Sequence, residues 1–253
     1  MDSGASSIVV SPDPRRLEQR RVAPLQLAPP AASLAWFDGV RRSKLRRPEP
    51  PAGALQRPRL LTQIDAAQAS LTLIVAPTGF GKSTLAAEWA SQDPPATWLT
   101  ADAADASLAR FWAHLQAGLG SITPGLGELV TASLALPHRA PAAELGRIFA
   151  DELLDHGEPV RIVIDDAHLI PAGEVHDFLN GLLELAPPAL RLLLTARNEP
   201  PIALSRFRLR GQMNDLSSAD LLFDTDEIGM LLANARQTDQ QILTATDIEN
   251  IRR

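Results

Sequence analysis

The 253-residue sequence contains no cysteine. Disulfide bonds, thiolate metal sites and a cysteine nucleophile are therefore excluded. Lysine is also scarce: of the 24 basic residues only Lys44 and Lys82 are lysines, and the others are arginines. A planar, bulky guanidinium does not replace a compact ammonium in a phosphate cradle. A lysine inside a phosphate-binding motif is therefore conspicuous in this chain.

Long apolar runs are absent as well. No stretch approaches the roughly 20 residues that a membrane-spanning helix needs. The first basic residues follow a very short apolar patch (residues 8–10), which is the wrong order for a signal peptide. Because 45% of the residues are apolar, the chain can form a substantial core. We expect a soluble, cytoplasmic protein.

The charge is unevenly distributed along the chain. The net charge is −6, but residues 1–60 hold 11 basic and 5 acidic side chains, whereas residues 61–253 hold 13 basic and 25 acidic ones. An acidic body is a poor general binder of nucleic acid. It needs a local cation to attract an anionic ligand such as ATP.

Residues 71–89, LTLIVAPTGFGKSTLAAEW, read as a buried strand, a Gly-rich turn and a helix. This is the context that a phosphate-binding P-loop, or Walker A motif, requires. The alternative is a Gly-rich turn before an ordinary helix. The residues expected to contact a nucleotide are Ala76, Pro77, Thr78, Gly79, Phe80, Gly81, Lys82, Ser83 and Thr84.

The residue types in this turn suit the chemistry of phosphate binding. Gly79 and Gly81 allow main-chain N–H groups to point at phosphate oxygens, and the helix that begins near Lys82 directs its positive end there. The Lys82 ammonium can bridge the β- and γ-phosphates, and the Ser83 hydroxyl can ligate Mg²⁺. Ala76 replaces the first glycine of the strict motif.

A second acidic motif, VRIVIDD, occupies residues 160–166. An apolar strand that ends in acid is the Walker B half of an NTPase site. We expect Asp165 to hold Mg²⁺ and Asp166 to polarise a water molecule for attack on the γ-phosphate. Two adjacent carboxylates at a buried strand end are unfavourable without a cation. The alternative is a strand that ends in an aspartate turn.

Arg197 directly follows a third buried strand, residues 189–196. Such an arginine is either a solvent-facing residue or a group that faces the γ-phosphate. The catalytic candidates are thus Lys82, Asp166 and Arg197, and the metal candidates are Ser83 and Asp165. His168 and His176 lack a partner at metal-ligand spacing, so we interpret them as surface residues or as support behind the site.

Strands and helices alternate along the chain, which predicts an α/β fold with a parallel sheet and helices on both faces. The ligand site should lie at the carboxyl ends of the strands. Expected strands cover residues 71–75, 96–100, 160–166, 189–196 and 212–216. Expected helices cover residues 60–68, 107–119, 144–156, 175–185 and 225–235. Residues 121–141 read as a loop.

The expected organisation has four parts: a disordered segment at 1–40, a basic Pro-rich segment at 41–60, a P-loop NTPase domain at 61–218 and the start of a small helical domain at 219–253. The basic segment permits three interpretations. It is a strap near the nucleotide, an arm that binds nucleic acid non-specifically, or a solvated linker.

Several phrases in residues 44–232 resemble one family. In order they are RRSKLRRPEPP, LTLIVAPTGFGKSTLAAEW, TWLTADAADASLARFW, IVIDDAHLI, LLLTARNEPP and LRGQMNDLSSADLLFDTDE. They are similar to the ATPase module of large LuxR-type, MalT-like transcriptional regulators. That family belongs to the STAND class of signal-transduction ATPases, within the AAA+-like P-loop proteins.

The resemblance implies a switch that rests with ADP, self-associates with ATP and is reset by slow hydrolysis with Mg²⁺. It also implies a sensor role for Arg197 and places Arg57, Pro58 and Arg59 near the adenine. The family's sensor repeats and helix-turn-helix are not visible here, so the chain resembles a truncated or split member, and we expect no sequence-specific DNA binding. Two alternatives stay open: a catalytically idle nucleotide-binding fragment and a small-molecule kinase with a lid at residues 206–210.

Overall fold

The computed structural model describes residues 39–50 and 54–238, with side chains described as far as Leu232. The segment before residue 39, which we predicted to be disordered, lies outside the described residues. So do residues 51–53 of the basic segment and residues 239–253 of the predicted helical domain. All described residues belong to one compact unit.

Five strands form a single sheet in the order β2-β3-β4-β1-β5, and every pair of neighbours is parallel. The strands are β1 (Leu71–Val75), β2 (Thr97–Thr100), β3 (Val160–Asp165), β4 (Leu190–Ala196) and β5 (Met213–Leu216). The predicted α/β fold with a parallel sheet is confirmed. Because β4 lies between β1 and β3, its carboxyl end adjoins both the P-loop and the acidic strand end.

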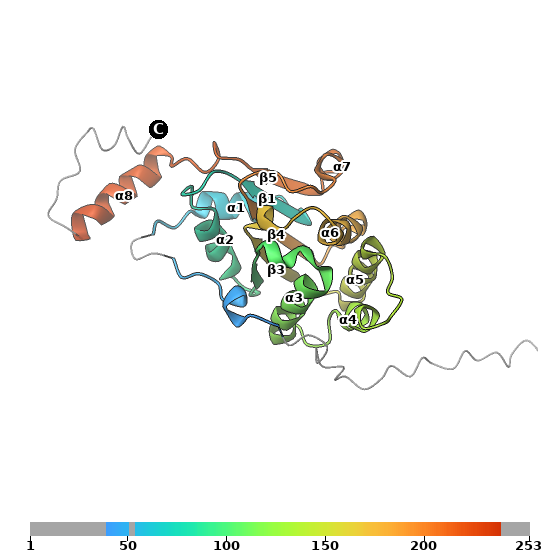
Figure 1. Cartoon of the computed structure of the whole chain (residues 1–253). Helices are drawn as coiled ribbons and strands as arrows, with labels where there is room; N and C mark the ends of the chain where they lie inside the picture. Colours follow the sequence, from blue (N-terminus) through green and yellow to red (C-terminus); the bar gives the residue numbers. More distant parts are fainter. Residues whose placement is uncertain (1–38, 51–53, 239–253) are drawn as a thin grey trace, which may run out of the picture. The chain divides into compact units, whose positions relative to one another are not determined.

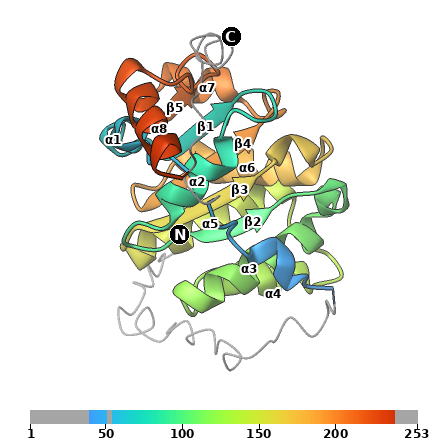
Figure 2. The ribbon, with the colours of Figure 1, turned by 90° about the vertical axis from the view of Figure 1, so that its left-hand side faces the viewer.

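Helices cover both faces of the sheet, as predicted (Figures 1 and 2). Helices α1 (Pro58–Ala66) and α2 (Lys82–Ala90) pack on one face. Helices α3 (Leu108–Ile122), α5 (Ala142–His156) and α6 (Glu174–Leu185) pack on the other. The remaining helices of the described residues are α4 (Glu128–Leu134), α7 (Leu204–Leu209) and α8 (Thr225–Thr238). None of the helices in the described ranges is long and apolar enough to cross a membrane.

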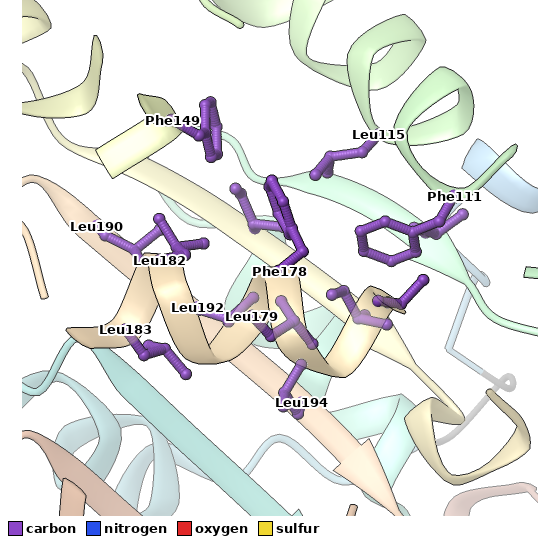
Figure 3. Close-up of a cluster of buried hydrophobic side chains, with 14 of the residues drawn as sticks. Phe111, Leu115, Phe149, Phe178, Leu179, Leu182, Leu183, Leu190, Leu192 and Leu194 are labelled. Carbon is purple, nitrogen blue, oxygen red and sulfur yellow. The ribbon is translucent and has the colours of Figure 1, made fainter. Parts of the chain in front are cut away.

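The apolar strands contribute to two cores because successive side chains point to opposite faces. In β3, Ile162 and Ile164 belong to the larger core with α3, α5 and α6, whereas Val163 belongs to the core with α1 and α2. Figure 3 shows the larger core, where Phe178 of α6 lies among leucines of β4 and the aromatic rings of α3 and α5. Burial on both faces explains why the central strands β1, β3 and β4 are largely apolar.

Helices α5 and α6 approach each other closely at two glycines. A Cβ atom on Gly181 would lie 1.9 Å from the Ala143 carbonyl oxygen, and one on Gly146 would lie 2.1 Å from the Phe178 carbonyl oxygen. Each glycine therefore makes room for the main chain of the other helix. Any larger residue at either position requires the helices to separate.

The structure corrects one prediction, about residues 121–141. The stretch 121–141, predicted to be a loop, contains α4, which is too short to show a clear period. Tertiary contacts hold it: the Leu129 amide donates to Glu152 of α5 at 3.2 Å, and Trp112 of α3 donates to Thr131 at 2.8 Å. Ser107 precedes α3 but makes no side-chain capping bond. In contrast, Asp102 and Asp105 form a capping box at the 3₁₀ helix Ala103–Ala106.

The basic segment is anchored at its start. Residues Arg42–Leu45 form a 3₁₀ helix. Lys44 is buried, forms a short ion pair with the fully buried Asp105 and contacts Asp102 at 3.1 Å. A solvated linker therefore does not describe this part of the segment, because an ammonium is removed from water only when it is paired.

Candidate functional site

The P-loop connects β1 to α2 and has the main-chain geometry of an anion cradle. Gly79 and Gly81 have φ values of +89° and +78°, which residues other than glycine rarely adopt. A Cβ atom at either position would meet no atom within 4 Å, so the space in front of both is open. Gly81 is the N-cap of α2, and the free N–H groups of that helix end therefore face the same space.

Lys82 is the first residue of α2 and is buried. Its Nζ donates a hydrogen bond to the Pro77 carbonyl oxygen at 2.9 Å, so the side chain folds back over the loop. Burial lowers the pKa of the Lys82 ammonium, while the carboxylates of Asp166 and Asp165 counter that effect. The ammonium is thus held among acidic groups at the cradle.

Asp165, the last residue of β3, lies beside the P-loop. Its Oδ1 accepts a hydrogen bond from the Ser83 hydroxyl at 2.9 Å. Burial raises the pKa of the Asp165 carboxyl, and the charge of Asp166 raises it further, against the hydrogen bonds from Thr195 and Ser83. A buried carboxylate of this kind is stabilised by a cation. The structure therefore brings the two predicted metal ligands into contact.

Asp166 follows β3 in the left-handed conformation, with φ of +56°. Asp and Asn tolerate this region better than most residues. Its carboxylate is one-third exposed, and Oδ1 lies 3.8 Å from His168 Nδ1. Burial lowers the pKa of His168, and neither ring nitrogen has a hydrogen-bond partner in the described residues. Of the two histidines, His168 thus lies behind the site, whereas His176 is a buried residue of α6 and not a surface one.

Arg197 is exposed at the carboxyl end of β4. Burial is the main cause of the lowered pKa of Lys82 and of His168, and the Arg197 charge contributes to both shifts. The guanidinium therefore lies near both residues. Within the described ranges it makes no hydrogen bond or ion pair, so it is available to an anion.

Sequence reasoning missed one residue at the centre of this arrangement. Thr195 of β4 is fully buried, and its hydroxyl contacts both Asp165 and the Asp166 main chain. The available signal was a single hydroxyl near the end of the apolar strand ALRLLLTA. A buried hydroxyl in such a strand requires a polar partner.

A pocket of about 420 Å³ adjoins the P-loop on the side of α1 and α8. Apolar side chains line most of it, and Arg57 and Glu88 are its charged residues. The lining consists of Ala54, Leu55, Arg57, Gly79, Phe80, Gly81, Thr84, Leu85, Glu88, Leu221, Leu222, Phe223 and Leu231. A flat apolar group attached to a bound phosphate chain would fit this position.

The three residues predicted near the adenine are in different places. Arg57 lines the pocket, but its guanidinium is engaged: it pairs with Glu227 at 2.8 Å, donates to the Leu221 carbonyl oxygen and lies 4.7 Å from the Phe223 ring centre. Pro58 begins α1. Arg59 is absent from the lining and pairs with Asp224 at 3.1 Å. Arg57 therefore shapes the pocket by fixing the start of α8.

The residues present fit a nucleotide with its magnesium ion. The cradle is open, an ammonium and a helix N-terminus face it, and the hydroxyl of Ser83 with the carboxylate of Asp165 is a hard-oxygen donor pair of the kind that Mg²⁺ prefers. No group of three or more His, Asp or Glu side chains in the described ranges could hold a metal. Phosphate oxygens and water would therefore have to complete the coordination.

Comparison with known proteins agrees with this geometry. A family model described as "AAA domain" matches residues 65–204, more than half of the chain. The chain belongs to the AAA domain family. The matched range begins in α1, contains the P-loop, the β3 acids and Arg197, and ends at the start of α7.

The AAA domain is also similar to curated proteins named "HTH-type transcriptional regulator MalT". Over 189 residues, or 73% of this chain, it is 33% identical to the protein from Klebsiella pneumoniae subsp. pneumoniae, 34% to that from Serratia proteamaculans and 33% to that from Yersinia enterocolitica. The chain spans about a fifth of the length of these relatives, since the match covers 21% of each. The predicted relationship to the ATPase module of MalT-like regulators is confirmed.

Among solved structures, one titled "Structure of C. elegans PCH-2" matches 63% of this chain and 41% of that chain, with 11% identity and a TM-score of 0.31. The family match and the site geometry together identify a nucleotide-binding module of the P-loop type. The roles of individual residues stay predictions.

Proposed function

We propose that this AAA domain binds Mg-ATP, hydrolyses it slowly and uses the nucleotide state to control self-association in a MalT-like transcriptional regulator. The observation that carries the proposal is the hydrogen bond between Ser83 and Asp165. It joins the P-loop to the acidic strand end, next to a lysine and an open cradle. The match to MalT regulators supports the regulatory setting.

In this proposal each residue has a separate task. The P-loop amides and Lys82 bind the phosphates, and Ser83 and Asp165 hold Mg²⁺, which neutralises charge on the phosphate oxygens when bound. Asp166 accepts a proton from the attacking water. Arg197 binds the oxygens of the γ-phosphate, so its position differs between the ATP and ADP states. The apolar pocket behind Phe80 takes the base.

Thermal unfolding tests nucleotide binding. A ligand at 100 times its Kd stabilises the fold by about 2.7 kcal/mol, which raises the Tm of a domain of this size by roughly 5–10 °C. We expect such a rise with Mg-ATP and with Mg-ADP, and none in Lys82→Ala. The matched control is Lys44→Ala, the other lysine variant, which should lower the starting Tm and keep the rise. An equal rise in Lys82→Ala would remove the P-loop assignment.

Sedimentation velocity tests the switch. We expect a larger species with Mg-ATP than with Mg-ADP, and only the small species for Lys82→Ala in either nucleotide. The same sedimentation coefficient in both nucleotides, together with a normal thermal shift, would leave a nucleotide-binding module without nucleotide-controlled association. Hydrolysis is measured separately, so binding without turnover would identify the catalytically idle alternative.

A further inference from the structure

The Thr195 hydroxyl contacts both acids that follow the apolar part of β3. Thr195 is fully buried in β4, between the P-loop strand β1 and the acidic strand β3. It pairs with Ile74 in β1, two residues before the P-loop begins, and it directly follows the last residue of β4 that pairs with β3. Parallel strands bring their carboxyl ends to one edge of the sheet. Thr195 therefore lies behind the cradle and in contact with both acids.

The Thr195 hydroxyl makes two hydrogen bonds of different kinds. It donates its only proton to Asp165 Oδ1 at 2.5 Å, and it accepts the Asp166 main-chain N–H at 3.0 Å. A hydroxyl has one donor and two acceptor sites. The donor is therefore committed to the carboxylate, and an acceptor site is committed to the next residue along the chain. Because threonine is branched at Cβ, its χ1 angle is stiff and the oxygen is held in place.

These two bonds act on different features of the acids. The first orients the Asp165 carboxylate, whose Oδ1 also meets Ser83. The second holds the Asp166 main chain where φ is +56°, a conformation that costs energy for a residue with a side chain. The direction of the Asp166 carboxylate depends on that conformation.

We propose that Thr195 is a positioning residue for magnesium binding and hydrolysis: its hydroxyl fixes the Asp165 carboxylate against Ser83 and anchors the main chain of Asp166. The inference rests on the proposed function, because it assigns Thr195 a task in that reaction. Packing alone does not account for the hydroxyl. Valine has the same shape and would fill the same buried site without a polar atom to satisfy.

The test compares Thr195→Val, which keeps the shape, with Thr195→Ser, which keeps the hydroxyl. Thr97→Val is the matched control, because Thr97 is also a buried strand threonine but makes no side-chain hydrogen bond in the described residues. Three quantities are measured: the ratio of the ADP dissociation constants without and with Mg²⁺, the kcat and KM for ATP, and hydrogen exchange of the Asp166 amide by NMR.

In Thr195→Val we expect the magnesium-dependent tightening of ADP binding to fall roughly 10–100-fold, which is the usual effect of losing a residue that orients a metal ligand. The kcat should fall with little change in KM, and the Asp166 amide should exchange faster. Thr195→Ser should restore most of each property, and Thr97→Val should match the wild type in all three.

The outcomes separate the two proposals. A wild-type chain that binds no nucleotide contradicts the proposed function, while exchange of the Asp166 amide still reports on the anchor. Nucleotide binding without turnover contradicts only the hydrolysis, and the magnesium ratio then decides the role of Thr195. An unchanged ratio, or an unchanged Asp166 exchange rate, in Thr195→Val overturns the positioning role.

Discussion

The Ser83 hydroxyl donates a hydrogen bond of 2.9 Å to Asp165 Oδ1, although the two residues are 82 positions apart in the sequence. The contact joins the P-loop to the acidic end of β3, and these two side chains would hold a magnesium ion there, directly or through water. The Asp165 carboxylate is buried, which costs folding free energy, and a bound cation would offset that cost. Stability and ligand binding are therefore opposed at this residue.

Asp165→Asn tests that opposition. Removing the charge should weaken the magnesium-dependent part of nucleotide binding by at least the roughly 10–100-fold that loss of an outer partner costs. It should not lower the stability of the ligand-free protein, because an amide is easier to bury than a carboxylate. Isothermal titration with ADP, with and without Mg²⁺, measures the magnesium-dependent part of binding. Urea unfolding of the free protein measures its stability. Weaker stability with unchanged magnesium dependence would make Asp165 a structural residue.

Asp166→Asn tests the proton acceptor. Asparagine also tolerates the left-handed conformation, so the fold should be retained. Loss of a general base lowers turnover by about 10²–10⁴-fold, and we expect such a fall in kcat with nucleotide affinity preserved. Asp177→Asn, which changes an exposed carboxylate of α6, is the control. Equal ATP turnover in wild type and Asp166→Asn would reassign the base.

Asp105→Asn tests the anchor of the basic segment. Burial opposes ionisation of Asp105, but hydrogen bonds from His114 and Lys44 outweigh it and hold the pKa of the carboxyl below its usual value. A lowered pKa stabilises the fold above about pH 4, and this contribution is lost as the pH falls through the folded-state pKa. Breaking a buried pair costs about 3–5 kcal/mol.

We therefore expect Asp105→Asn to lose about 3 kcal/mol of unfolding free energy at pH 7. The gap to wild type should stay constant down to about pH 5 and narrow below about pH 4. Urea unfolding of both proteins between pH 7 and acidic pH measures this difference in stability. Glu49→Gln, which removes the exposed pair with Arg46, should change stability by less than about 1 kcal/mol. A gap that is independent of pH would show that the ionised carboxylate is not the stabilising species.

Gly181→Ala tests the close approach of α5 and α6. The added carbon would overlap the Ala143 carbonyl, and overpacking of this kind costs about 1–3 kcal/mol. Gly120→Ala in α3 is the matched control, since a Cβ there meets nothing within 4 Å. In a helix interior, that change should be neutral or stabilising by up to about 1 kcal/mol. Urea unfolding measures the stability of both variants. If Gly181→Ala were as stable as Gly120→Ala, α5 and α6 would separate without a cost in free energy.

The sequence was informative where a function is built from consecutive residues. The strand-turn-helix of the P-loop could be read directly, because residues 71–89 carry the strand, the two glycines and the lysine in one stretch. The alternation of buried strands and helices also predicted the parallel sheet. Short elements were harder: α4 has few residues, and its formation depends on Glu152 and Trp112 from other helices.

By itself, the sequence determined the fold class, the phosphate cradle and the identity of the acids, since each of these follows from local pattern and residue chemistry. Only the tertiary structure decided that Thr195 bridges the two acids and that Arg57 is engaged by Glu227, 170 positions away. Such contacts depend on strand order and on which side chains meet across the sheet. No local period encodes them, because the free energy that selects them comes from burying the two helical layers against the sheet.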